Sequence, residues 1–332
     1  MIFRGLVKFA VLTILALTVI WAASALYLDV PIPWLRIPLS LAFLILVLVI
    51  FVTVKRWTLA AGCCFGLFAL VVTWWLTLSP SNDRPWLPDV AQTPWADVQG
   101  DTVTIHNVRN FDYATETDYK VNWETRTLDL SKIRGADLFM NYWGSPAIAH
   151  TILSVDFAGS PPIALSIETR KVTGQSYSAV LGFFRQYALV YVIGDERDIV
   201  RLRTNYRHGE DLYLYHTRAT PARARAIFLD YLKTANDLRV HPQWYNALTS
   251  NCTTDILPHL MVAGGPGRLP WDYRILLNGY ADQMVYEQGR LAAGGLPFDE
   301  LKRRAHINEA ARAADQSPDF SRLIRVGRPG FE

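Results

Sequence analysis

Residues 150–171 read HTILSVDFAGSPPIALSIETRK, in which two segments with a period of two flank a Gly-Ser-Pro-Pro turn. Such alternation is typical of β-strands with one face on a core, and the turn residues favour a chain reversal. The segment therefore predicts an antiparallel hairpin of His150–Phe157 with Ile163–Lys171. The expected core-facing residues of the second strand are Ile163, Leu165 and Ile167, and the expected polar ones are Ser166, Glu168 and Arg170.

The hairpin also predicts a pair of interacting side chains. When the core faces of the two strands are aligned, His150 lies on the same surface as Glu168 or Arg170 and near them. A carboxylate beside a histidine fixes its tautomer and stabilises the imidazolium, which is the role of the third member of a catalytic triad. His150 is thus a candidate base with Glu168 as its orienting residue, and the alternative is a structural histidine at a strand edge.

Around this hairpin, the chain after residue 101 reads as strands followed by helices, which predicts an α+β fold with an antiparallel sheet covered by helices. The clearest helix is Thr220–Val240, with Thr220 as N-cap and Pro221 in the first turn. Further helices are expected from Cys252 to Val262 and over Phe298–Ala314. The other expected strands are Thr102–Val108, Tyr119–Leu130, Ala136–Tyr142, Tyr187–Ile193 and Asp211–His216.

Cys252 is the candidate nucleophile, in the stretch YNALTSNCTTD over residues 245–255. With Asn251 as N-cap and Thr253 in the first turn, we expect its thiol to face unpaired N–H groups at a helix start. Those groups favour the thiolate and could stabilise an oxyanion, so Asn251 and Thr253 are candidate supporting residues. The alternative is an inert buried cysteine, which is a common environment for free cysteine.

Three apolar runs precede this part of the chain: Phe9–Leu28, Ile37–Val54 and Trp57–Leu78. Each is close to the roughly 20 residues that a helix needs to cross a bilayer. Basic residues lie before the first run and between the second and third, which predicts a cytoplasmic N-terminus and a periplasmic remainder. The expected division is a three-helix membrane region over 1–79, a linker over 80–101 and a periplasmic domain over 102–332.

The charge of the chain argues against a nucleic-acid surface. Of 33 Lys and Arg, 5 lie before residue 79, and of 30 Asp and Glu, 1 does, which leaves 28 against 29 in the remainder. The basic excess therefore follows the membrane topology. No spacing of His, Cys, Asp and Glu resembles a metal site, and no glycine loop resembles a phosphate site, so no cofactor is expected. An unpaired cysteine in an oxidising compartment strengthens the nucleophile hypothesis for Cys252.

From about Asn107 to His259 the chain resembles the bacterial Lnb lipoprotein N-acyltransferases and their periplasmic domain. The resemblance rests on ordered segments, and these are NVRNFDY at 107–113, WGSP at 143–146 with His150, SIETRK at 166–171, GFFRQY at 182–187, DERD at 195–198 and WYNALTSNCTT at 244–254. It implies a permuted papain-like (NlpC-type) cysteine fold, with Cys252 as nucleophile and His150 as base. The chain departs from the family pattern in its N-terminal spans and in Ala188, where an acidic residue is common.

The leading functional hypothesis is an inner-membrane cysteine acyltransferase. Cys252 takes an acyl chain from a membrane phospholipid as a thioester, and the resemblance implies transfer to the N-terminal amine of a lipoprotein. One alternative is a cysteine peptidase or amidase acting on an envelope substrate such as peptidoglycan. Another is a non-enzymatic anchored domain that binds a lipid or an envelope protein, with Cys252 structural. Thiol reactivity separates the last hypothesis from the first two.

Overall fold

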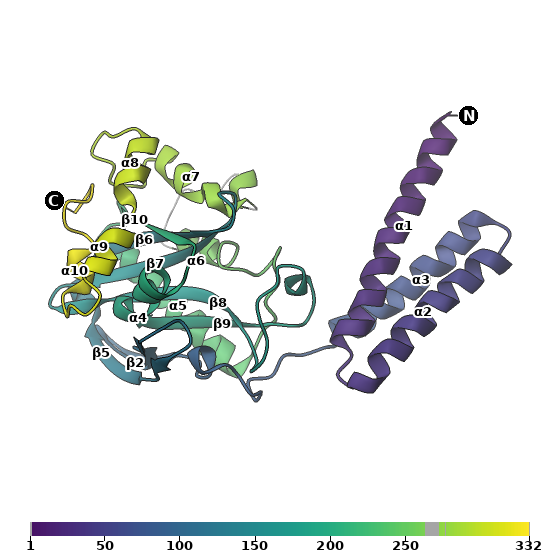
Figure 1. Ribbon diagram of the computed structural model, residues 1–332, viewed down its shortest axis with the longest axis horizontal. Coiled ribbons are helices and arrows are strands. Elements are labelled where there is room, and N and C mark those ends of the chain that lie inside the picture. The colour runs from purple at the N-terminus through teal and green to yellow at the C-terminus, as the bar shows by residue number, and fades with distance from the viewer. Residues whose placement is uncertain (1, 263–271, 276, 332) are drawn as a thin grey trace. The chain divides into compact units, whose positions relative to one another are not determined.

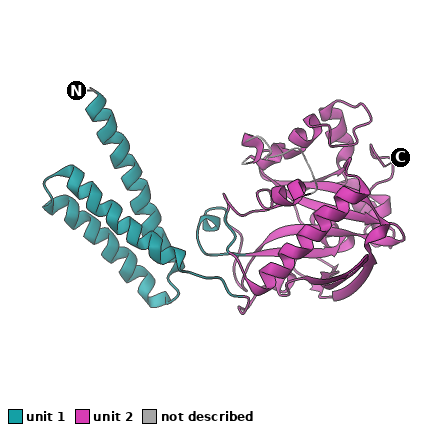
Figure 2. Cartoon of the chain, turned by 180° about the vertical axis from the view of Figure 1, so that it is seen from behind, with its two compact units in different colours: residues 1–81, 178–188, 244–246 teal, residues 82–177, 189–243, 247–332 magenta. Residues whose placement is uncertain are grey.

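The computed structural model describes residues 2–262, 272–275 and 277–331 of the chain. The described chain divides into two compact units (Figure 2). Unit 1 contains residues 1–81 together with the segments 178–188 and 244–246, and unit 2 contains 82–177, 189–243 and 247–332. The predicted boundaries at residues 79 and 101 stay predictions.

Unit 1 contains three long apolar helices, α1 (Ile2–Asp29), α2 (Pro33–Thr53) and α3 (Trp57–Leu76), which are drawn in purple and blue in Figure 1. Each is long and apolar enough to cross a membrane, so the three apolar N-terminal helices expected from the sequence are confirmed. Most of their large apolar side chains are exposed in the isolated chain, as lipid-facing side chains are.

The segment 178–188 packs against the ends of these helices within unit 1. Asp29 at the end of α1 accepts hydrogen bonds from Trp75 Nε1 (2.7 Å), from the backbone N–H of Arg185 (3.1 Å) and from Gln186 Nε2 (2.6 Å). Phe184 lies in an apolar cluster with helix residues that include Trp21. The GFFRQY stretch of the family resemblance therefore contacts the membrane helices.

Unit 2 is built on an eight-stranded sheet with the order β1-β2-β9-β8-β7-β6-β10, and β5 also pairs with β2 (Figure 1). The pairs β1/β2, β2/β5, β6/β7, β7/β8 and β6/β10 are antiparallel, whereas β2/β9 is parallel. The sheet is therefore mixed, and the predicted α+β class is confirmed. The strands are β1 (Trp95–Gln99), β2 (Thr102–Arg109), β5 (Trp123–Asp129), β6 (Ile133–Trp143), β7 (Ala149–Phe157), β8 (Ser160–Arg170), β9 (Ala188–Asp195) and β10 (Glu210–His216), with β3 (Asp112–Tyr113) and β4 (Tyr119–Lys120) in a small separate sheet.

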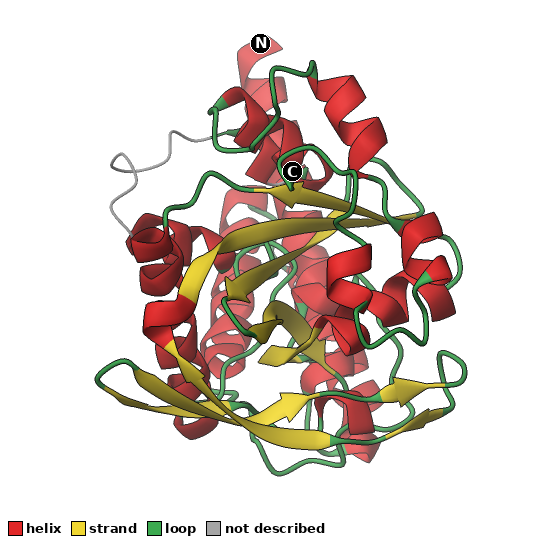
Figure 3. Cartoon of the chain, turned by 90° about the vertical axis from the view of Figure 1, so that its left-hand side faces the viewer, coloured by secondary structure: helices red, strands yellow, loops and turns green. Residues whose placement is uncertain are grey.

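Helices cover both faces of the sheet (Figure 3). On one face α5 (Pro221–Val240) packs against β6 and β7, where Phe228 meets Phe157 edge to face. On the other face Phe139 and Ile152 pack against α4 (Glu196–Arg201) and against α9 (Asn308–Ala313) and α10 (Phe320–Leu323). Ser166 and Arg170, which were expected on the polar side of the second hairpin strand, are both buried.

Two predicted elements are divided in the structure. The strand expected over 119–130 forms β4 and β5, and the helix expected over 298–314 forms α8 (Phe298–Ala305) and α9. The break in the second case lies at Ile307, whose N–H donates to the carbonyl oxygen of Leu212 in β10. Sheet contacts of this kind override the local helical pattern.

Candidate active site

The predicted hairpin is present as β7 and β8, with Ile152 opposite Ser166 in its register. Two residues further along this ladder, His150 meets Glu168: its Nε2 lies 3.1 Å from Glu168 Oε1. Ser166 lies between them, since its hydroxyl is 2.7 Å from His150 Nε2 and donates to Glu168 Oε1 at 2.6 Å. The histidine and the carboxylate are therefore linked both directly and through a serine.

Glu168 is held as a carboxylate by two cationic neighbours. Burial would raise its pKa, but His150 and Arg203 hold the pKa well below the ordinary value. Arg203 Nη2 lies 2.5 Å from Glu168 Oε1, and its Nη1 donates to the carbonyl oxygen of Ile199 at 2.7 Å. Arg203 comes from a π-helical turn, η4 (Leu202–Tyr206), which follows α4 directly.

Cys252 lies against His150 and is buried with it, each residue being 8% exposed. The His150 side chain and the backbone N–H of Thr151 hydrogen-bond to the thiol. Burial would raise the thiol pKa, but the positive charge of His150 and these hydrogen bonds lower it. Burial likewise opposes protonation of His150, but Glu168 and Cys252 raise the pKa of the imidazole to about 9. The arrangement favours a thiolate–imidazolium pair near neutral pH.

The helix expected to begin at Cys252 begins four residues later, as α6 (Ile256–Val262). Cys252 itself lies in a turn that Asn251 closes, because its Oδ1 accepts from the N–H groups of Thr253 (2.9 Å) and Thr254 (3.1 Å). These N–H groups are therefore engaged and do not face an oxyanion, contrary to the expectation. Asn251 positions the cysteine turn, and the thiolate is stabilised by His150 rather than by a helix terminus.

Asn278 is a site residue that the sequence analysis missed. It lies in η6 (Asn278–Tyr280), and its Nδ2 donates to Thr253 Oγ1 at 2.7 Å and lies 3.9 Å from Cys252 Sγ. Its Oδ1 accepts from the N–H of Ala149 at 2.9 Å, so it joins the start of β7 to the cysteine turn. Gly279 permits this approach, since a Cβ there would collide with the backbone of Pro146 and Ala147.

Tyr231 of α5 adds a buried hydroxyl near the pair. Burial raises its pKa well above the ordinary value, and the nearby charges of Glu168 and Cys252 add to this effect. The phenol is fully buried, and its oxygen has no hydrogen-bond partner among the residues that the structure describes. Asn278 Nδ2, which lies 3.9 Å from Cys252 Sγ, is therefore a side-chain donor that can meet negative charge developing next to Cys252.

Other candidates from the sequence lie elsewhere. Arg170 donates to Asn82 Oδ1 and to the carbonyl oxygens of Val90 and Ala91, so it does not pair with His150. His259 hydrogen-bonds to two other side chains: its Nδ1 lies 2.7 Å from Asp230 Oδ2, and its Nε2 lies 2.9 Å from the Tyr191 hydroxyl oxygen. The histidine that interacts with Cys252 is His150.

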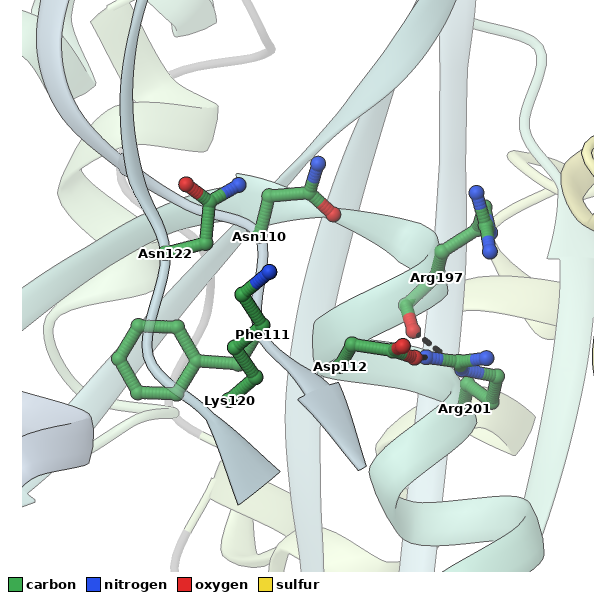
Figure 4. A pocket seen from close by; sticks show the side chains of 7 residues that line it. All are labelled: Asn110, Phe111, Asp112, Lys120, Asn122, Arg197 and Arg201. Atoms are coloured by element: carbon green, nitrogen blue, oxygen red, sulfur yellow. Dashed lines mark hydrogen bonds and ion pairs between the residues drawn. The ribbon is translucent and has the colours of Figure 1, made fainter. Parts of the chain in front are cut away.

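A cavity of about 320 Å³ shares no residue with this site. It is lined by polar and charged side chains near β3 and α4 (Figure 4). There Arg201 donates to Asp112 Oδ1 at 2.6 Å and to the carbonyl oxygen of Arg197 at 2.7 Å. No group of three or more His, Cys, Asp or Glu in the described part of the chain is arranged to hold a metal ion.

Comparison with known families gives a match whose range spans this site. Residues 119–279 match the model of a family described as the Lnb N-terminal periplasmic domain. This part of the chain is therefore similar to the Lnb N-terminal periplasmic domain, and the resemblance seen in the sequence is confirmed. The matched range includes His150, Glu168, Cys252 and Asn278. Neither the curated proteins nor the solved structures give a significant match, and the papain-like order of the fold stays a prediction.

Proposed function

We propose that this protein is a cysteine acyltransferase, anchored in the inner membrane with its N-terminus cytoplasmic and its second unit periplasmic. The observation that carries the proposal is the hydrogen-bonded chain Cys252–His150–Glu168. The chain pairs a thiol of lowered pKa with a histidine whose pKa is about 9. That pair suits acyl transfer, because the thiolate attacks carbonyl carbon and the imidazolium supplies the proton for the leaving group.

In the first half-reaction the Cys252 thiolate attacks an ester carbonyl carbon of a membrane phospholipid. The new C–S bond forms, the C–O ester bond breaks, and the proton on His150 passes to the departing alkoxide of the lysophospholipid. Nε2 of His150 is engaged by Ser166 and Glu168, which leaves Nδ1 as the ring nitrogen for this transfer. The product is an acyl thioester on Cys252 beside a neutral His150.

In the second half-reaction an amine attacks the thioester carbonyl. The C–N bond forms, the C–S bond breaks to regenerate the thiolate, and His150 takes the proton that the amine loses. The family resemblance implies that this amine is the N-terminal cysteine amine of a diacylated lipoprotein. Three apolar helices suit this chemistry, since the donor and the acceptor are both confined to the bilayer.

The test is the mass of a lipoprotein N-terminal peptide from cells depleted of their usual lipoprotein N-acyltransferase. Expression of the wild-type chain should raise that mass by one amide-linked acyl chain, and Cys252→Ala should not. Cys63→Ala is the matched control, because it removes a thiol from α3 and should leave the mass gain intact. No mass gain with wild type, together with cleavage of peptidoglycan fragments, would move the assignment to an amidase.

A further inference from the structure

A second cavity of about 270 Å³ lies between the sheet and three helices. Its walls come from β6 and β7 on one side and from α5, α6 and α7 (Ala281–Glu287) on the other. Most of its lining is aliphatic and includes Leu138, Leu153, Ile227, Leu257 and Met284. The volume lies just below the roughly 300–1,000 Å³ that is typical of small-molecule sites.

The cavity adjoins the nucleophile. Thr151 and Thr253 both line it, and they follow His150 and Cys252 in the chain. The backbone N–H of Thr151 hydrogen-bonds to the Cys252 thiol, and Asn278 binds the Thr253 hydroxyl, so both residues are fixed relative to that sulfur. Thr253 Oγ1 lies 3.9 Å from Cys252 Sγ and Thr253 lines the cavity, so an apolar group attached at Cys252 is close to this apolar space.

Arginines line the same cavity and favour one class of occupant. Arg223 and Arg290 are partly exposed, which places them at its rim, and Arg223 donates to the carbonyl oxygen of Leu260 at 3.1 Å. Neither forms an ion pair with Asp or Glu within the described ranges. A ligand with both an apolar chain and an anionic group satisfies the cavity and its rim together, and a phospholipid has both.

We infer that this cavity binds the acyl chain that the donor phospholipid passes to Cys252, with the lipid phosphate at the Arg223–Arg290 rim. The inference rests on the proposed function and deepens it, because it assigns the site that selects the chain. The chain is shielded from water in the cavity while its carbonyl carbon is held at the sulfur. Side chains of α7 then set the length of chain that fits.

Photo-crosslinking tests the occupant without requiring acyl transfer. Full-length Cys252→Ala is placed in phosphatidylethanolamine vesicles that contain a phospholipid with a diazirine group on one acyl chain. After illumination, we expect labelled peptides from residues 253–262 and 281–290. Labels confined to α1, α2 and α3, with none on those peptides, would overturn the inference whatever the enzyme activity proves to be.

Chain selection tests the same inference on the active protein. Vesicles with donor lipids of mixed chain length are offered to the wild type and to Ala281→Phe, which fills the cavity from the start of α7. In Ala281→Phe the ratio of short-chain to long-chain thioester on Cys252, read from the masses, should rise about tenfold, since pocket discrimination per methylene is of that order. Ala313→Phe is the matched control, because Ala313 is exposed on α9, and it should leave the distribution unchanged.

Met284→Ala enlarges the cavity and should shift the distribution the other way, toward long chains. This second variant keeps the test decisive if Ala281→Phe does not fold. Thioesters of unchanged chain distribution in folded variants would overturn the inference while leaving the proposed function standing. Absence of any thioester in wild type would instead contradict the proposed function, and the crosslinking result would still decide the cavity.

Discussion

The β7/β8 hairpin and the Cys252 turn contribute the two halves of the site in different ways. In the hairpin, the ladder that places Ile152 opposite Ser166 also determines that His150 meets Glu168. In the turn, Cys252 is positioned by side chains, with Asn251 closing it locally and Asn278 reaching it from a distant segment. A regular sheet therefore orients the base, whereas side-chain hydrogen bonds outside regular secondary structure position the nucleophile.

The largest expected loss of activity comes from a substitution in the Cys252 turn. Cys252→Ala should reduce acyl transfer at least about a thousandfold, because no other thiol can form the thioester. The free energy of unfolding should change by only about 1 kcal/mol, since the lost group is small. Both are measured on the full-length protein in vesicles, and retained activity in this folded variant would remove the nucleophile from the account.

The hairpin should be nearly as sensitive. His150→Ala removes the proton donor and the charge that lowers the thiol pKa, so acyl transfer should fall about a thousandfold. In wild type the rate should decline as the pH rises through about 9, where His150 loses its proton. A rate that stays constant through pH 9 to 10 would contradict the role of His150 as acid.

Glu168→Gln should have an intermediate effect, about 10- to 100-fold on the rate. The amide cannot stabilise the imidazolium, so the high-pH limb of the rate profile should move below 9, since Glu168 is the foremost of the groups that raise the His150 pKa. Glu309→Gln is the matched control, because Glu309 is exposed on α9, and no change is expected. An unmoved limb in Glu168→Gln would mean that the carboxylate does not orient the base.

Asn251→Ala should have the smallest effect. Loss of the two hydrogen bonds that close the turn should cost about 1 kcal/mol of stability, as for other lost caps, and reduce the rate several-fold. The thermal midpoint measures the expected loss of stability, and the acyl-transfer rate measures the expected loss of activity. Because His150 is untouched, the high-pH limb should stay where it is in wild type, and a shift of that limb would show that the turn and the hairpin are not independent.

The hairpin was predictable from the sequence because a period of two fixes which residues face each other. The local pattern does not show that helices cover both faces, and so the burial of Ser166 and its position between His150 and Glu168 could not be predicted. Asn278 and Arg203 enter the site through contacts between segments far apart in the chain, which have no local signature.

The cysteine turn was predictable only in part. Asn251 caps the turn as expected, but its side chain accepts hydrogen bonds from the same N–H groups that were expected to stabilise an oxyanion. The helix α6 begins only at Ile256. The N-cap preference of asparagine specifies a turn closure and not the length of the helix that follows it.

The most direct test of the central claim is the pH dependence of Cys252 alkylation. Cys63 and Cys64 are replaced by Ala in the full-length protein, and the rate of reaction with iodoacetamide is then measured from roughly pH 4 to 10. This range includes the ordinary thiol pKa of about 8.5. The account predicts half-maximal thiolate below that value, and a shift up to it or above in His150→Ala, because the imidazolium stabilises the thiolate. An ordinary thiol profile that is the same with and without His150 would contradict it.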